Sequence, residues 1–156
     1  PVLNINVQVT DNGGLTYTKG LSAQVKDINE LPTPDLITGI LDLPQKVNLK
    51  GKGVVPIALH GDAAVDVRQL DLLTMRFGLS QNSSIGIARK GKKNALQASF
   101  ADLNGDGFQD VLAKVGRTEM ASVIPRGSLY IDAFGKLKDG RDIIFGLAPT
   151  DSVVFF

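Results

Sequence analysis

The sequence of 156 residues predicts an all-β protein. Near its start, apolar and polar residues alternate over residues 3–10, which is the period of a half-buried strand. Farther along, short apolar segments are separated by Gly, Pro and Asp turns, a spacing typical of a β-sandwich. Glu30 and Glu119 are the only glutamates among sixteen acidic residues, which leaves fourteen aspartates. Aspartate favours turns over helix interiors, so the acidic composition also indicates β structure.

The first 38 residues predict a β-hairpin followed by a linker. A turn signal at residues 11–14 (DNGG) separates the first strand from a second, alternating segment around residues 21–25. Two prolines within residues 32–34 exclude a continuous helix and favour an extended linker. We therefore expect a hairpin and linker over residues 1–38 and a separate module over residues 39–156.

The module over residues 39–156 predicts short strands joined by turns. The expected strands cover residues 47–49, 54–59, 74–77, 96–100, 111–115, 128–133 and 152–156. Pro56 lies inside an apolar strand and indicates a bulge or an edge position. Residues 65–73 fit a helical turn or a short crossover, and Gly78 is expected to end the strand over 74–77. This order of elements predicts an Ig-like, Greek-key β-sandwich.

One loop in this module, residues 102–110 (DLNGDGFQD), carries oxygen-bearing side chains at alternate positions. The expected calcium ligands are the side chains of Asp102, Asn104, Asp106 and Asp110 and the backbone carbonyl of Phe108. Oxygen ligands at this spacing wrap one hard cation, Ca²⁺, and Gly107 permits the sharp turn. Ala113 stands where helix–loop–helix calcium proteins need a bidentate Glu, so we expect a calcium loop within a β protein. The alternative is a tight Asp/Gly turn without a metal.

A second candidate metal site lies in the linker, where residues 27–32 read DINELP. Together with the hairpin before it, this segment resembles the last two strands and the calcium linker of a cadherin-like repeat, whose pattern is D-x-N-(D/E)-x-P. The resemblance covers residues 2–32. It implies that Asp27, Asn29 and Glu30, and more weakly Asp11, bind calcium between consecutive domains and stiffen a rod. A hydrophilic linker without a metal is the alternative.

The rest of the chain also has a family resemblance. The segments that carry it are Lys52–Ile57, Asp66–Asp71, Phe77-Gly78, Asp102–Asp110 and Asp151–Val153. In this order they resemble a poorly characterised module of secreted, multidomain bacterial and archaeal proteins. The resemblance covers residues 47–156 and implies an extracellular setting and a β fold, but no activity is attached to that family.

Several function classes are disfavoured by composition. A net charge of +1 gives no reason to expect a nucleic-acid partner, and the chain has no cysteine for disulfides or thiolate chemistry. His60 is the single histidine, and paired carboxylates for hydrolysis are not evident, so we do not expect an enzyme. The basic cluster at residues 89–93 (RKGKK) is expected to be a solvated hairpin tip. A grip on acidic polysaccharide or on an acidic neighbouring surface is its alternative role.

These observations predict a calcium-binding structural or adhesion module of an extracellular, cell-surface or filamentous multidomain protein. Its expected partners are neighbouring domains or subunits of the same protein, because the chain reads as a fragment of something longer. No apolar run approaches the length of about 18 residues that a transmembrane helix needs. The alternative function is a carbohydrate-binding accessory module of a secreted polysaccharide-degrading enzyme, with a surface glycan as its partner.

Overall fold

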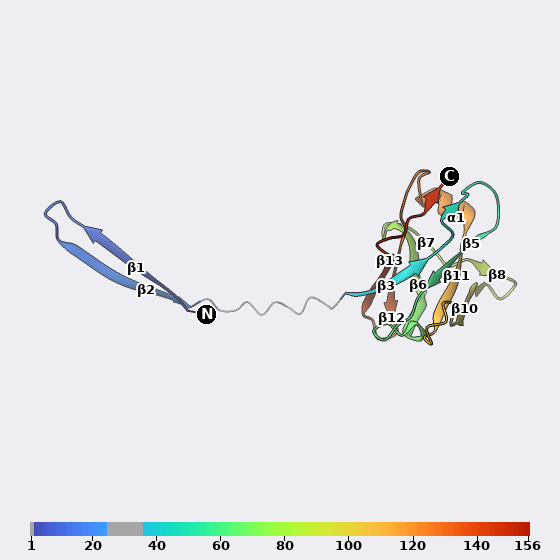
Figure 1. Cartoon of the computed structure of the whole chain (residues 1–156), viewed down its shortest axis with the longest axis horizontal. Coiled ribbons are helices and arrows are strands. Elements are labelled where there is room, and N and C mark those ends of the chain that lie inside the picture. Colours follow the sequence, from blue (N-terminus) through green and yellow to red (C-terminus); the bar gives the residue numbers. More distant parts are fainter. Residues whose placement is uncertain (1, 25–35) are drawn as a thin grey trace. The chain divides into compact units, whose positions relative to one another are not determined.

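The computed structural model describes residues 2–24 and 36–156, and the chain divides into two compact units, residues 1–33 and 34–156 (Figure 1). The first unit contains an antiparallel hairpin of β1 (Val2–Thr10) and β2 (Thr16–Gln24), paired without interruption along both strands. Asp11 Oδ1 accepts hydrogen bonds from the N–H groups of Gly13 and Leu15 at 2.8 and 2.9 Å, which fixes the turn. The linker candidates Asp27, Asn29 and Glu30 lie outside the described residues.

The second unit is built on one eight-stranded mixed sheet, which confirms the all-β fold class. Its strands are β3 (Ile37–Asp42), β5 (Val54–Leu59), β6 (Leu70–Ser80), β7 (Ser83–Gly86), β10 (Ala98–Ala101), β11 (Asp110–Gly116), β12 (Asp132–Leu137) and β13 (Asp142–Leu147). They lie in the order β10-β11-β5-β3-β13-β12-β6-β7, and β13 pairs with β3 in parallel while the other neighbours are antiparallel. The sheet is curled, which gives a sandwich-like unit with one interior.

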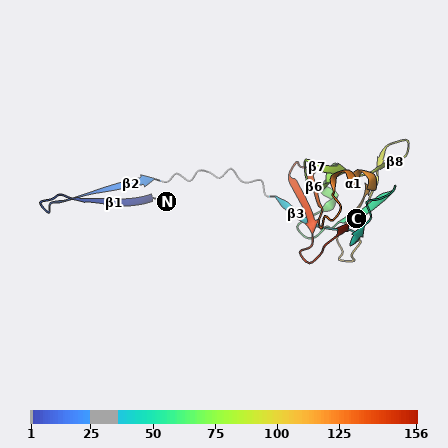
Figure 2. The same cartoon turned by 90° about the horizontal axis from the view of Figure 1, so that it is seen from above.

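Shorter elements complete the second unit. They are β4 (Lys46–Val47), which pairs in parallel with β14 (Val154–Phe155), β8 (Arg89–Lys90), which pairs with β9 (Ala95–Leu96), the 3₁₀ turn η1 (Val67–Gln69) and the helix α1 (Arg117–Val123). The helix lies beside β7 in both views (Figures 1 and 2). Neither helix among the described residues is long and apolar enough to cross a membrane.

The interior of the curled sheet holds a single apolar core. Alternate residues of β5 and β11 face it: Val55, Ile57, Leu59, Val111, Ala113 and Val115 are all buried. Phe77, Phe145 and Phe155 are its largest members, each 1% exposed or less. This alternation is the period-2 pattern of strands that bury one face. The pairing of Leu59 with Val111 places the end of β5 beside the start of β11.

Pro56 shows how the sheet tolerates a residue without an N–H group. It is exposed and lies opposite Lys114 of β11. On the other side of β5, strand β3 pairs only with Ala58 and Leu59. Pro56 therefore has a neighbouring strand on one side only, which is the edge-like position that a strand proline requires.

Two local predictions were wrong, and two elements were missed. The strand predicted over residues 74–77 spans Leu70–Ser80, so Gly78 does not end it. Glycine is needed there because a Cβ would collide with the Ser83 carbonyl where β6 and β7 approach. The helical turn expected within residues 65–73 is present at Val67–Gln69, and residues 70–73 belong to β6. The strand expected over 128–133 begins at Asp132, and neither α1 nor β13 was predicted. Both missed elements are short, so their local patterns are weak.

The close contact between Gly39 of β3 and Phe145 of β13 gives a test of this packing. The two residues are register partners, and a Cβ at Gly39 would lie 2.5 Å from the Phe145 ring. We expect Gly39→Ala to lower the free energy of unfolding by about 1–3 kcal/mol in urea denaturation, because the buried ring cannot move freely. Gly146→Ala is the matched control, since its Cβ would be 3.4 Å from the nearest atom. Equal stability of the two variants would contradict the packing.

Candidate functional site

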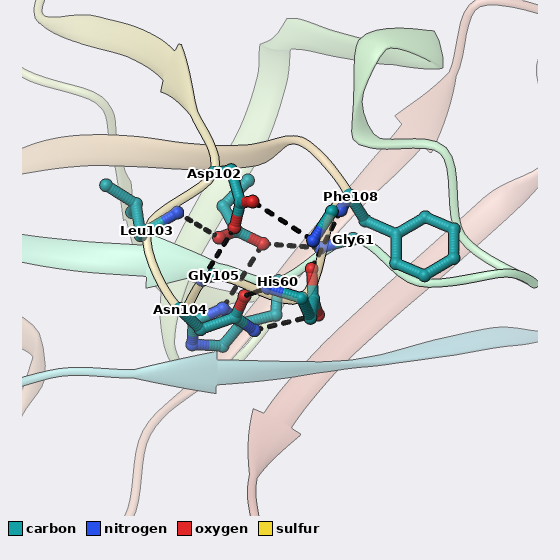
Figure 3. A network of polar contacts seen from close by, with 10 residues as sticks. His60, Gly61, Asp102, Leu103, Asn104, Gly105 and Phe108 are labelled. Carbon is teal, nitrogen blue, oxygen red and sulfur yellow. Dashed lines mark hydrogen bonds and ion pairs between the residues drawn. The ribbon is translucent and has the colours of Figure 1, made fainter.

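The predicted calcium loop connects β10 to β11 and lies at the surface. Every residue from 102 to 109 is exposed. Gly105 and Gly107 have backbone φ angles of +79° and +89°, values that residues with a Cβ rarely adopt. The alternation of glycine with oxygen-bearing residues therefore lets the chain reverse twice within a few residues, so that the polar side chains fold back onto the loop backbone (Figure 3).

The three leading side chains of the loop accept hydrogen bonds from its own backbone. Asp102 accepts from Gly105 N at 2.7 Å through Oδ1 and from Gly107 N at 3.0 Å through Oδ2. Asn104 Oδ1 accepts from Asp106 N at 3.0 Å, and Asp106 Oδ1 accepts from Phe108 N at 2.8 Å. Each of these oxygens has two lone pairs, so each keeps one after its backbone bond.

Asp110, the last residue of the motif, has a different environment. Its side chain is fully buried, although it begins β11 directly after the exposed loop. Asp110 Oδ2 accepts from Leu103 N at 2.7 Å, and Oδ1 accepts from Gly61 N at 2.9 Å. The carboxylate therefore joins the loop to the segment that follows β5, which makes it the anchor of the loop.

Opposing effects set the pKa of Asp110. Burial raises it, but the N–H groups of Leu103 and Gly61 stabilise the ionised form, and His60 adds to this. The net result is a pKa below the usual range for aspartate. Nδ1 of His60 lies 3.3 Å from Asp110 Oδ1 and makes no hydrogen bond. Asp110 is therefore an ionised group at neutral pH that is held by backbone donors.

Gly61 has to be glycine for this arrangement to form. It is buried, and a Cβ on it would collide with the backbone carbonyl of Gln109. The absence of a side chain allows the segment after β5 to approach the end of the loop closely. Its N–H group can then reach Asp110, 49 residues away in the sequence.

The candidate ligands fit a hard cation in chemistry but only partly in position. Asp102, Asn104 and Asp106 offer oxygens with spare lone pairs, as calcium requires. However, Asn104 Nδ2 donates to Asp106 Oδ2 at 2.9 Å, so a cation at that oxygen would have to replace this donor. No group of three or more His, Cys, Asp or Glu side chains is placed to hold a metal within residues 2–24 and 36–156. The inward turn of Asp110 is one physical reason.

Two further aspartates lie close to the loop, but both are engaged. A pocket of about 290 Å³ separates Phe108 from Asp62 and Asp66. Asp62 Oδ1 accepts hydrogen bonds from the N–H groups of Ala64 and Val65 at 2.7 and 2.8 Å. Asp66 forms an ion pair with Arg68 at 2.8 Å. These bonds stabilise the turn at residues 62–66, and among the described residues neither carboxylate joins the loop aspartates in a group of three that could hold a metal.

The sequence motif and the folded site thus agree in part. Asp102, Asn104, Asp106 and Phe108 share one surface loop, whereas Asp110 faces inward from the same loop. Sequence reasoning missed the contribution of Gly61 and did not place His60 beside Asp110. The available signal was a glycine two residues after a buried strand, because glycine often marks a close backbone approach.

No protein-family model, curated protein or solved structure matches this chain. The resemblances to a cadherin-like repeat and to a secreted β module therefore stay predictions.

The anchoring role of Asp110 can be tested with Asp110→Asn. The amide cannot accept from both Leu103 N and Gly61 N, so one buried donor loses its partner. We expect the free energy of unfolding at pH 7, measured in urea with chelator present, to fall by about 1–3 kcal/mol. The matched control is Asp151→Asn, because Asp151 is exposed. No loss of stability in Asp110→Asn would exclude the anchor.

The same pair of proteins gives a prediction on pH. The pKa of Asp110 is lower in the folded than in the unfolded chain, so its contribution is complete above the unfolded value of about 3.9. As the pH falls through the folded pKa, the contribution is lost. The stability difference between wild type and Asp110→Asn should therefore shrink below about pH 4. The raised pKa of Asp132, which results from burial, is common to both proteins and cancels. A constant difference from pH 7 to pH 2.5 would contradict this account.

Proposed function

We propose that residues 34–156 form a calcium-stabilised structural module of an extracellular multidomain protein. The observation that carries the proposal is the connection of the loop to the core. Its exposed oxygens keep free lone pairs, and buried Asp110 ties the loop to the ends of β5 and β11. A cation held by this loop would therefore stabilise the junction of two core strands as well as a surface turn.

The proposed ligands are the side chains of Asp102, Asn104 and Asp106 and the backbone carbonyl of Phe108. Asp102 and Asp106 lie on one short exposed loop, where their negative charges oppose compaction. When bound, calcium supplies positive charge and several oxygen-directed bonds at about 2.3–2.6 Å. Before it binds, the glycines and backbone donors already hold the loop near its reversed conformation, which lowers the cost of ordering it.

The proposed location is extracellular, because a loop with few charged ligands binds calcium weakly. Extracellular modules of this kind work with dissociation constants of about 10⁻⁴ to 10⁻³ M. The proposed partners are neighbouring domains or subunits of the same protein, joined through the predicted linker site at Asp27, Asn29 and Glu30. The role is mechanical or adhesive and requires no catalysis.

Thermal unfolding with and without calcium tests the proposal. A hundredfold excess of calcium over its dissociation constant should stabilise the chain by about 2.7 kcal/mol. For a domain of this size we expect the melting temperature to rise by about 10 °C. Asp106→Asn keeps the acceptor for Phe108 N but removes one charge, so it should lose most of this rise.

Asp151→Asn is the control, since it removes an exposed aspartate outside the loop and should keep the full calcium response. Magnesium at the same concentration controls for ionic strength, because it prefers a smaller octahedral site. Identical melting curves in calcium and in chelator would refute the proposed function.

A further inference from the structure

A second polar region lies away from the loop, in an open groove of about 660 Å³. Its lining includes the basic side chains of Lys52, Arg76 and Arg89, the acidic side chain of Glu119, and the polar side chains of Gln97 and Thr118. Partly buried Val54 and Ile85 contribute apolar surface between them. The volume falls within the range of about 300–1,000 Å³ that is typical of ligand sites.

The walls of the groove are held by backbone hydrogen bonds between segments distant in sequence. Ala88 N donates to Lys114 O at 2.8 Å, Lys114 N to Gln97 O at 2.9 Å, and Gln97 N to Ala88 O at 2.8 Å. This closed set joins the segment after β7 to β11. At the end of β11, Arg117 N donates to Gly53 O at 2.9 Å. The groove is therefore part of the framework, which is the support that a specific site needs.

The three cations of the groove form no ion pair with an acidic side chain among the described residues. Among the described residues, the ion pairs of Arg and Lys side chains are Arg68–Asp66, Lys136–Asp142 and Arg141–Asp139. None of them involves Lys52, Arg76 or Arg89. Arg76 Nη2 donates to Ser84 O at 2.9 Å, and Arg89 Nη1 donates to Asn94 O at 3.0 Å. Both guanidinium groups keep further N–H donors for a ligand, since each has five.

Glu119 prevents the groove from being purely basic. Its carboxylate folds back over Gly116, where a Cβ would collide with Glu119 Oε2. It can accept hydrogen bonds from hydroxyl groups, as can the amide oxygen of Gln97 and the hydroxyl of Thr118. The groove therefore combines donors suited to anions with acceptors suited to hydroxyls, and its positive excess is small.

We propose that this groove binds an acidic oligosaccharide whose charges are carboxylates, such as a chain of uronate units. Arginine forks match planar carboxylates in geometry, and spaced cations suit charges repeated along a chain. A densely sulfated chain carries more negative charge per sugar than a uronate chain, whereas Glu119 offsets part of the positive charge of the three cations. No aromatic residue lines the groove, so it lacks the stacking surface that single-stranded nucleic acids use. The site is independent of the calcium loop.

Isothermal titration of the full chain with hexagalacturonate tests this proposal. The titration is done in chelator at low ionic strength, where surface charges are least screened. We expect binding that becomes about tenfold weaker in Arg76→Gln and in Lys52→Gln, since each removes one charged donor. Arg141→Gln is the matched control, because Arg141 is an exposed arginine paired with Asp139 and should leave the affinity unchanged. Melting curves of each variant verify folding.

Two comparison sugars and a titration with calcium test the specificity of the groove. Cellohexaose, a neutral chain of equal length, should bind at least tenfold more weakly, and so should a sulfated hexasaccharide. Equal affinity of the wild type and both groove variants, tighter binding of either comparison sugar, or no binding of hexagalacturonate would overturn the proposal. Binding that appears only with calcium would also overturn it, because it would place the sugar at a metal. A missing calcium effect on melting would leave the groove proposal intact.

Discussion

The carboxylate of Asp110 is buried beneath an exposed loop, and the local structure around the candidate metal site depends on it. An ionised group without water is tolerated only when donors surround it. Here the donors are the N–H groups of Leu103 and Gly61, which come from the loop and from the segment after β5. Because both belong to the backbone, the requirement to satisfy one charge fixes the paths of two chain segments.

Glycine makes this close approach possible at more than one position. Gly61 admits the Gln109 carbonyl, Gly78 admits the Ser83 carbonyl, and Gly39 admits the Phe145 ring. In each case the missing side chain lets two parts of the curled sheet lie nearer than other residues would allow. The surface of the second unit carries an acidic loop and a separate groove with three basic side chains, whereas the chain as a whole has a net charge of only +1.

Local patterns predicted what depends on neighbours in sequence. Alternation identified the strand that contains Val111, Ala113 and Val115, and the glycines of residues 102–110 identified the loop. The inward orientation of Asp110 was beyond such reasoning, since it depends on Gly61, 49 residues away. Strand β13 was missed for a different reason: it pairs with its neighbour in sequence, β12, but its six residues give only a weak local pattern. The helix α1 spans only seven residues, and Met120 is its one buried residue, with Val123 partly buried against the core, which leaves almost no periodic signal.

The position of Ala113 limits what the loop can do as a calcium site. Helix–loop–helix calcium proteins place a bidentate Glu there, and closure of that residue on the metal moves a helix. Ala113 is fully buried on β11, opposite Ile57 of β5, so a carboxylate at this position would have to enter the apolar core. The proposed site therefore has fewer charged ligands than a helix–loop–helix site, and it lacks the bidentate Glu through which calcium moves a helix. Such a site binds weakly and fills only where calcium is abundant, and its effect is to stabilise strands that are already paired.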